Sequence, residues 1–388
     1  MCLKKNKIKI TILMPCLNEK ETLGICITKA KKWIDRYGIG AEVLVADNGS
    51  SDGSQEIAHN LGARVVTVDQ RGYGSALFHG TLAAKGEWII MGDSDDSYDF
   101  SELDLFVQKL DQGFDLVMGN RFAGGIDPGA MPWKNKYIGN PILSSIGKVL
   151  FRCPVHDFHC GLRAFTKNAF LLMDLRTTGM EYASEMVIKA TLYGMRICEV
   201  PTRLSKDGRS RPPHLRPWRD GWRHLRFMFL FSPRWLFFIP GSTLLLMSSL
   251  IYCSILISPL RVGNIVFDIN TLLFSQAGVL LGILLLTTGL SVRIIATKEG
   301  FLKENKFIQR FVGTATPEIG GLTGAFFICL GFLGGIWAMY KWASVKFGQL
   351  VPDLLIRMVS FSTLLFSIGG IMVTTSLVIG FLSLQTKK

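Results

Sequence analysis

The sequence predicts an α/β domain of the doubly wound type, followed by a membrane region of four helices. Apolar runs of strand length alternate with helical stretches through residues 8–120. From Trp235 onward the chain is mostly apolar. A basic segment containing several tryptophans and phenylalanines joins these two parts. The composition therefore predicts one water-exposed domain and one membrane domain.

The strand-like runs of the first part end in polar residues. These runs are "IKITILMP", "AEVLVAD", "ARVVTV", "EWIIMGD" and "DLVMGN". Ligands of doubly wound sheets bind at the carboxyl ends of the strands. We therefore expect Glu19, Asp47, Asp93 and Asp95 to mark a binding site. The first strand is followed by "PCLNE" and not by G-x-G-x-x-G, which argues against a dinucleotide site.

Residues 91–100, "MGDSDDSYDF", place three carboxylates directly after a buried strand. Neighbouring like charges repel one another unless a cation lies between them, and a simple turn is the alternative explanation. Carboxylate oxygens are hard ligands that suit Mg²⁺ or Mn²⁺. Asp99 leaves two interpretations open, a part in this site or an N-cap of a helix starting near Ser101.

Four apolar stretches are long enough to cross a bilayer, which takes about 20 residues. They cover about 235–258, 271–296, 320–343 and 359–384. The connection after the second stretch is rich in Lys and Arg, so the positive-inside rule predicts that the N-terminal domain and both termini are cytosolic. In a prokaryote this describes a multi-pass protein of the cell inner membrane. No signal peptide is predicted.

The predicted spans contain almost no ionisable residues, which argues against a transporter. Small residues in "GFLGG" and "SIGG" predict close packing between helices and are compatible with a homo-oligomer.

Residues 203–226 carry eight Arg and Lys against two Asp, within a chain of net charge +13. Apolar residues recur at helical spacing with arginines between them: Trp218, Trp222, Leu225 and Phe229, and Arg219, Arg223 and Arg226. This pattern predicts an amphipathic helix in the headgroup layer over 214–232, and a solvated basic helix is the alternative. Because the positive charge lies where anionic lipid is, no nucleic-acid partner is expected.

Eight cysteines are scattered along the chain and indicate reduced thiols. One cluster, "CPVHDFHC", offers four zinc ligands: Cys153, His156, His159 and Cys160. They are crowded into eight residues, whereas structural zinc sites usually space two ligand pairs apart. Zinc is therefore the weaker interpretation of this cluster.

The motifs "MPCLNE", "ADNGSSDGS", "RGYGSA" and "GDSDD", in that order, resemble glycosyltransferase family 2, which has the GT-A fold. "GNRF", "DFHCGLRAF", "GMEYASEMVIKA" and the basic segment resemble its polyprenyl-phosphate sugar synthases, the branch of dolichyl-phosphate mannose synthase. The resemblance covers about residues 8–232. Together with the amphipathic pattern and the apolar stretches, it divides the chain into a GT-A domain over 1–213, the interfacial helix over 214–232 and the transmembrane domain over 233–388.

This resemblance implies transfer of a single hexose, with inversion, from a nucleotide sugar of the GDP-mannose or UDP-glucose type. The acceptor is a dolichyl or undecaprenyl phosphate at the cytosolic membrane face. The implied donor-binding residues are Pro15, Leu17, Glu19, Asp47 and Asp93. The implied metal ligands for Mg²⁺ or Mn²⁺ are Asp93, Asp95 and Ser97. Leu17 stands where mannose synthases commonly have an aromatic residue, so the identity of the base is left open.

The resemblance also implies residues for the acceptor and the chemistry. The acceptor-phosphate residues are Arg121, Lys136, Asn140, Arg209 and Arg211. The catalytic residues are Asp95, Arg121, Arg163 and Asp157. A phosphate monoester has a second pKa of about 6, so no strong general base is needed. Asp157 leaves two interpretations open, a place near the reacting sugar or a structural ion pair with an arginine.

Two further functions compete with this prediction. Arg234 and Trp235 resemble the end of the Q-x-x-R-W motif of processive synthases, although Phe231 occupies the glutamine position. A processive membrane polysaccharide synthase is therefore the first alternative. A non-catalytic scaffold or flippase is the second, and the intact carboxylates argue against it.

Overall fold

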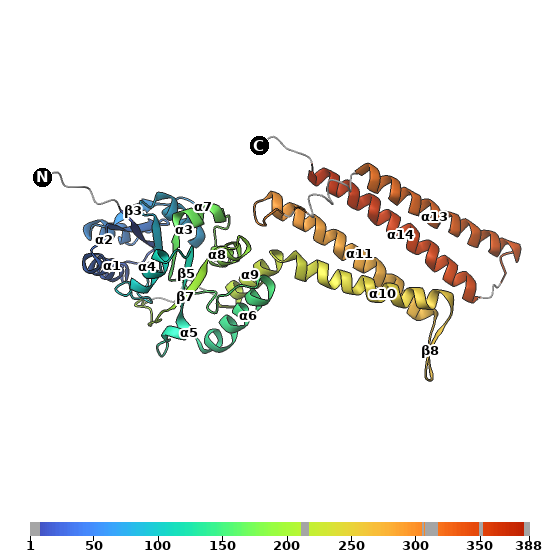
Figure 1. Cartoon of the computed structure of the whole chain (residues 1–388), viewed down its shortest axis with the longest axis horizontal. Helices are drawn as coiled ribbons and strands as arrows, with labels where there is room; N and C mark the ends of the chain where they lie inside the picture. Colours follow the sequence, from blue (N-terminus) through green and yellow to red (C-terminus); the bar gives the residue numbers. More distant parts are fainter. Residues whose placement is uncertain (1–7, 211–216, 305, 307–316, 349–351, 384–388) are drawn as a thin grey trace. The chain divides into compact units, whose positions relative to one another are not determined.

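A computed structural model describes residues 8–210, 217–304, 306, 317–348 and 352–383. The chain divides into two compact units, Met1–Met228 and Phe229–Lys388. The first unit carries a β-sheet covered by helices, and the second carries long helices (Figure 1).

A seven-stranded mixed sheet forms the centre of the first unit, in the order β3-β2-β1-β4-β6-β5-β7. Its strands are β1 (Ile10–Cys16), β2 (Ala41–Asp47), β3 (Arg64–Thr67), β4 (Trp88–Met91), β5 (Leu116–Asn120), β6 (Arg163–Thr166) and β7 (Ile197–Pro201). Strand β6 runs antiparallel to both β4 and β5, and the other pairs are parallel. The predicted α/β class is confirmed, and the sheet is mixed because β6, a strand that the sequence analysis did not predict, runs antiparallel to its neighbours.

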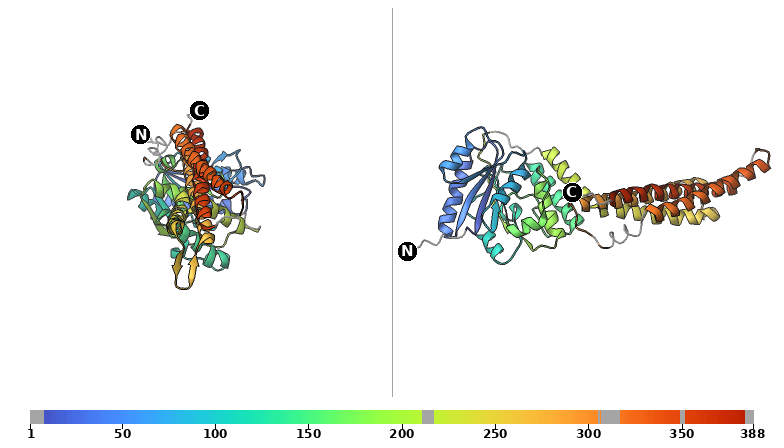
Figure 2. Two further views of the ribbon diagram at one scale, coloured as in Figure 1. Left: turned by 90° about the vertical axis from the view of Figure 1, so that its right-hand side faces the viewer. Right: turned by 90° about the horizontal axis from the view of Figure 1, so that it is seen from above.

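Helices cover the sheet, and the right-hand view of Figure 2 shows the strands between them. They are α1 (Leu23–Tyr37), α2 (Ser54–Asn60), α3 (Tyr73–Ala83), α4 (Asp104–Asp111), α5 (Arg121–Gly124), the π-helical turn η1 (Asn135–Gly139), α6 (Asn140–Phe151), α7 (Lys167–Met173), α8 (Tyr182–Leu192) and α9 (Pro217–Leu230). Cys16 pairs with Asp47, so the carboxyl ends of β1 and β2 are level with each other.

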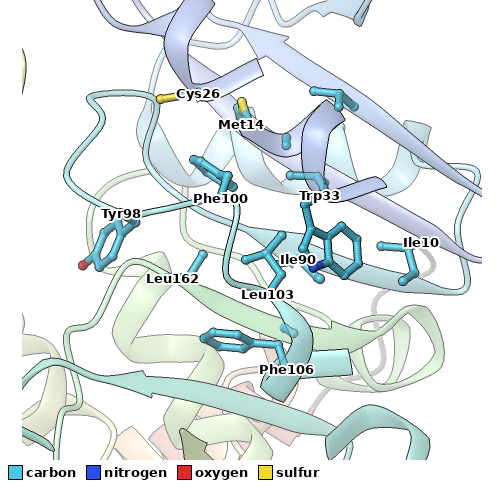
Figure 3. Close-up of a cluster of buried hydrophobic side chains, with 14 of the residues drawn as sticks. Ile10, Met14, Cys26, Trp33, Ile90, Tyr98, Phe100, Leu103, Phe106 and Leu162 are labelled. Atoms are coloured by element: carbon cyan, nitrogen blue, oxygen red, sulfur yellow. The ribbon is translucent and has the colours of Figure 1, made fainter. Parts of the chain in front are cut away.

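One core cluster packs α1 against the sheet (Figure 3). The buried residues of α1 recur every three or four positions, from Leu23 to Trp33, which is the spacing of one helix face. They meet Ile10 of β1, Ile90 of β4 and Phe100 of the following loop, all fully buried. Each large side chain buried in this way contributes about 1.5–3 kcal/mol. This packing holds the loops that follow β1 and β4 in place.

Within the described residues, four helices are long and apolar enough to cross a membrane: Arg234–Ile257, Ile269–Lys298, Pro317–Ser344 and Leu355–Leu382. They comprise the π-helical turn η2 (Arg234–Phe238) with α10 (Ile239–Ile257), then α11 (Ile269–Lys298), α13 (Pro317–Ser344) and α14 (Pro352–Ser383). A hairpin of β8 (Leu260–Val262) and β9 (Ile265–Phe267) joins α10 to α11. The prediction of four spans is confirmed.

Helices α13 and α14 lie side by side (Figure 1) and approach closely where their glycines meet. A Cβ atom on Gly369 would lie 2.5 Å from the Gly324 carbonyl oxygen, and one on Gly331 would lie 2.6 Å from the Ser362 carbonyl oxygen. The glycines are therefore required for this contact, as the small-residue pattern predicted.

The fourth span begins at Leu355, before the predicted start at 359, and so contains Arg357. Arg357 is buried and donates hydrogen bonds to Asp268 and to the Ile255 carbonyl. The expectation of nearly charge-free spans is wrong at this position. A paired charge is tolerated there because its partners replace water.

Candidate active site

A cavity of about 660 Å³ opens at the carboxyl ends of β1, β2 and β4. Of the residues predicted from the sequence, it is lined by Pro15, Leu17, Glu19, Asp93, Asp95 and Arg209. These residues come from loops that follow different strands and from the basic segment after β7. Pro15 and Arg209 are 194 positions apart in the sequence, so the fold brings distant residues together at this cavity.

Asp93 and Asp95 have different partners. The Tyr73 hydroxyl donates to Asp93 Oδ1 at 2.9 Å. Ser97 donates to Asp95 Oδ1 through its hydroxyl at 2.5 Å and its backbone N–H at 3.1 Å. Desolvation, together with the charge of Asp95, raises the pKa of Asp93 to about 6. A cation beside them would favour the ionised form of both carboxylates.

A protein cation already stands beside these carboxylates. Arg209 donates to both oxygens of Glu19 at 2.8 Å, and its Nη1 lies 3.4 Å from Asp95 Oδ2. Desolvation lowers the pKa of Arg209, but the hydrogen bond to Glu19 and the charge of Asp95 outweigh this and raise it. The position of Arg209 shows that Asp95 Oδ2 can accept a cation. Asp93 and Asp95 therefore fit a divalent ion, whereas Ser97 braces Asp95.

The loop that carries these carboxylates is fastened to the end of β1. Ser94 donates its hydroxyl to the Pro15 carbonyl at 2.7 Å, and the Thr22 hydroxyl donates to the Ser94 carbonyl at 2.7 Å. Asp96 forms an ion pair with Lys29 at 2.8 Å. The site carboxylates are thus held at a fixed place relative to the β1 loop.

Asp99 takes neither of its two predicted roles. It accepts hydrogen bonds from the Ser101 N–H and hydroxyl, while α4 begins only at Asp104. It therefore stabilises a turn that precedes the helix.

Asp47 is fully buried at the end of β2. Its Oδ2 accepts from the N–H groups of Gly49 and Ser50 and from Gln55 Nε2. Its Oδ1 has no hydrogen-bond partner within the described part of the chain. A buried polar atom of this kind costs free energy unless a ligand satisfies it. Asp47 itself does not line the cavity, although the neighbouring Asn48 and Gly49 do.

Arg121 and Asp157 form a buried ion pair outside the lining of the cavity. The guanidinium donates to both carboxylate oxygens at 2.7 Å, and the Arg121 N–H donates to Asp157 Oδ2 at 3.0 Å. Asp157 is fully buried. The ion-pair interpretation of Asp157 is the one that the structure shows.

Arg163 is also buried, but its partners are carbonyls. It donates to the carbonyl oxygens of Cys160, Ala183 and Phe158 at 2.8, 2.5 and 3.2 Å. Burial lowers the pKa of its guanidinium. The structure therefore differs from the prediction that Arg163 faces the reacting groups, because its side chain ties the β6 region to the start of α8.

Two predicted acceptor residues lie elsewhere in the first unit. Lys136 in η1 lies over the Tyr137 ring, 5.6 Å from its centroid, and Asn140 at the start of α6 donates to Met131 Sδ. Neither lines the cavity. Arg211 lies outside the described residues.

Comparison with known proteins identifies the family. The model "Glycosyl transferase family 2" matches residues 11–171, and "Glycosyltransferase family 2 C-terminal transmembrane region" matches residues 290–383. The low-salt glycan biosynthesis hexosyltransferase Agl6 of Haloferax volcanii is 33% identical over 342 residues, which are 88% of this chain and 82% of that protein. The chain belongs to glycosyl transferase family 2.

A second relative and a solved structure are similar to part of this chain. The dolichyl-phosphate hexose transferase of Haloferax volcanii is 31% identical over 193 residues, 50% of this chain and 81% of that protein. A crystal structure of glucosyl-3-phosphoglycerate synthase from Mycobacterium tuberculosis, with Mn²⁺ and UDP, superposes with a TM-score of 0.45 at 22% identity. It covers 57% of this chain and 78% of that one. The predicted family and its enzyme class are confirmed, and this glycosyltransferase is a membrane protein.

The glycosyltransferase site also contains residues that the sequence did not assign to it: Arg71, Tyr73 and Met180, and Arg219 and Arg223, which were predicted only as part of the interfacial helix. Tyr73 follows Gly72, whose φ of +141° favours glycine and whose Cβ would overlap the Thr178 carbonyl. The quoted "RGYGSA" motif was therefore a signal for Tyr73. At "CPVHDFHC", as elsewhere in the described residues, no three His, Cys, Asp or Glu side chains are grouped so that they could hold a metal ion. His156 instead pairs with Glu199 at 2.9 Å.

Proposed function

We propose that this glycosyltransferase moves one hexose from a nucleotide sugar to a polyprenyl phosphate at the cytosolic membrane face. The observation that carries the proposal is the cavity itself. It is lined on one side by Asp93 and Asp95, the D-x-D carboxylates, and on another by residues of α9, the helix that precedes the first span. Such a cavity suits a water-soluble donor and an acceptor that stays in the membrane. The similarity to a dolichyl-phosphate hexose transferase supports the same acceptor class.

On the donor side, the base would bond to the unpartnered Asp47 Oδ1, near Pro15 and Leu17. Glu19 would accept from the ribose hydroxyls once Arg209 moves away from it. Asp93 and Asp95 would hold Mg²⁺ or Mn²⁺, which neutralises a leaving diphosphate. Ser97 keeps Asp95 oriented for this task.

On the acceptor side, a phosphate monoester is largely dianionic at neutral pH and needs no strong base. It would attack the anomeric carbon from the face opposite the leaving group, which inverts that centre. Arg209 lines the cavity and remains a proposed acceptor ligand. The acceptor roles of Lys136, Asn140 and Arg211 remain predictions. We assign Arg121 with Asp157 and Arg163 to supporting the site.

Product analysis tests this proposal. Membranes containing the full chain are incubated with labelled UDP- and GDP-sugars, a polyprenyl phosphate and Mg²⁺. The expected product is a chloroform-soluble lipid that carries one sugar with inverted anomeric configuration. A polymer would support the processive synthase, and no transfer with any donor would support the scaffold or flippase.

A further inference from the structure

Helix α9 has three chemically distinct faces. His224, Phe227 and Met228 are buried. Trp222, Leu225 and Phe229 lie on a second face, where Trp222 is 62% exposed. The side chain of Trp218 lies outside the described residues. At about 100° per residue, Arg219, Arg223 and Arg226 fall within about 60° of one another and between the first two faces. The arginines thus form a stripe along the border between the buried and the outward apolar face.

This helix is fastened to the catalytic unit through α8. Arg223 Nε lies 2.9 Å from Glu181 Oε1, at the residue before α8 begins. His224 Nδ1 lies 2.8 Å from the Ser184 hydroxyl, and its ring stands edge-on to His159 at 4.7 Å. These contacts fix the rotation of α9 about its own axis. The arginine stripe is therefore held toward the cavity.

Arg219 and Arg223 line the cavity beside Gly179 and Met180, and Arg226 does not. A Cβ atom on Gly179 would lie 3.4 Å from Arg223 Nη2, so the guanidinium lies against the backbone of that loop. The same cavity holds Asp93 and Asp95 at the carboxyl end of β4. One wall thus supplies two cations, and the sheet edge supplies two carboxylates.

Only a short stretch of chain separates α9 from the first span. Helix α9 ends at Leu230 and the first span begins at Arg234, so at most about 14 Å of chain separates them. A phosphate that carries a long apolar tail must keep the tail in lipid while its head reaches the donor. The arginine stripe meets that need, because the apolar face of α9 lies on one side of it and the cavity on the other.

We infer that Arg219 and Arg223 form the subsite for the phosphate monoester of the lipid acceptor. This inference rests on the proposed function. An oxygen of the phosphate dianion forms the new bond to the anomeric carbon, and the bond from that carbon to the donor diphosphate breaks. The electron pair leaves with the nucleoside diphosphate. No proton has to be removed, so two guanidinium groups suffice to hold the acceptor anion.

The test uses the full chain in detergent with a short-chain polyprenyl phosphate, so that membrane attachment does not affect the measurement. Arg219→Ala and Arg223→Ala are each expected to raise the KM for this acceptor about ten- to a hundred-fold. The Kd of UDP or GDP with Mg²⁺, measured by calorimetry, should stay within about two-fold. Hydrolysis of the donor by water should also persist, because water needs no phosphate subsite.

Arg226→Ala is the matched control, since it removes the same charge from the same stripe outside the cavity. It is expected to change the acceptor KM by less than about two-fold. Arg219→Lys and Arg223→Lys should raise the acceptor KM less than the alanine variants do. Lysine keeps the positive charge but lacks the planar guanidinium group that binds two phosphate oxygens at once.

An unchanged acceptor KM with a raised nucleotide Kd would overturn the inference and leave the proposed function standing. Equal effects of Arg226→Ala and Arg219→Ala would overturn it as well. If the unsubstituted enzyme makes no lipid-linked sugar at all, the proposed function fails and the subsite fails with it.

Discussion

At the scale of single residues, the role of each charged side chain in and around the site depends on the groups that it contacts. Asp95 and Asp96 are neighbours in the sequence, yet Asp95 lines the cavity beside Arg209 and Asp96 pairs with Lys29. Arg121 and Arg209 are both arginines of family motifs, yet only Arg209 lines the cavity. Contact and burial, rather than residue type, therefore separate the groups that can meet substrate from those that support them.

We predict that Asp95→Asn lowers turnover by more than about a hundred-fold, since a lost metal contact is worth several kcal/mol. Asp93→Asn should also lower turnover, and EDTA should abolish it until Mg²⁺ or Mn²⁺ is restored. Asp96→Asn is the control, because asparagine tolerates the φ of +61° at this position. Initial rates of sugar transfer measure all three variants. Full turnover in metal-free buffer would contradict the assignment of Asp93 and Asp95.

We predict that Arg121→Ala destabilises the catalytic unit by about 3–5 kcal/mol, because it leaves the Asp157 carboxylate buried without its partner. Arg203→Ala removes an arginine from the exposed Asp127 pair and should cost much less, because water screens that pair. Unfolding in urea, followed in detergent, gives both values. Equal losses would mean that the buried pair is not a support of the site.

At the scale of elements, the sequence predicted where the strands with site residues lie along the chain better than it predicted the course of every strand in the sheet. The D-x-D pair was placed correctly at the end of β4, because an apolar run followed by carboxylates is visible in the chain. Strand β6 was missed altogether, since its four residues are too short a run to show an alternation of side chains. The spacing of residues in α9 predicted its apolar and basic faces. It could not predict which face packs against α8, because that depends on the contact of His224 with Ser184, which is distant in the sequence.

A buried network under the cavity loop was also invisible in the sequence. Glu185 and Lys189 of α8 are both fully buried and pair at 2.9 Å. Glu185 also accepts from the N–H groups of Arg176 and Thr177, and Lys189 donates to the Asp174 carbonyl. The network holds the segment that leads to Gly179 and Met180 at the cavity.

We predict that Glu185→Ala costs about 3–5 kcal/mol, because the Lys189 charge loses its buried partner. The amides of Arg176 and Thr177 should then exchange their hydrogens faster, which hydrogen–deuterium exchange of the full chain measures. Glu56→Ala, on the exposed side of α2, should change stability by less than about 0.5 kcal/mol. If the amides of Arg176 and Thr177 exchange at the same rate in both variants, the network does not hold this loop in place.

At the scale of the whole molecule, the chain joins a catalytic unit to a membrane unit through one helix. The hydropathy of the sequence located the four spans. It could not show that Arg357 pairs with Asp268, because an average over neighbouring residues in the sequence contains no information on contacts in space. The division at Met228 and Phe229 leaves most of α9 with the catalytic unit. The cavity is accordingly lined by residues of the first unit.

We therefore predict that residues 1–232, without the spans, fold, bind the nucleotide and float with anionic vesicles at low salt. Each basic residue near an anionic surface contributes about 1 kcal/mol, and this attraction is screened within about 8 Å at physiological salt. Arg226→Glu together with Trp222→Ser should release the truncated chain from vesicles, whereas Lys32→Glu on α1 should not. With a short water-soluble acceptor the truncated chain should still transfer sugar. If it binds the nucleotide but cannot use that acceptor, the spans build part of the acceptor site, because the nucleotide pocket would then be intact and only the second substrate would be lost.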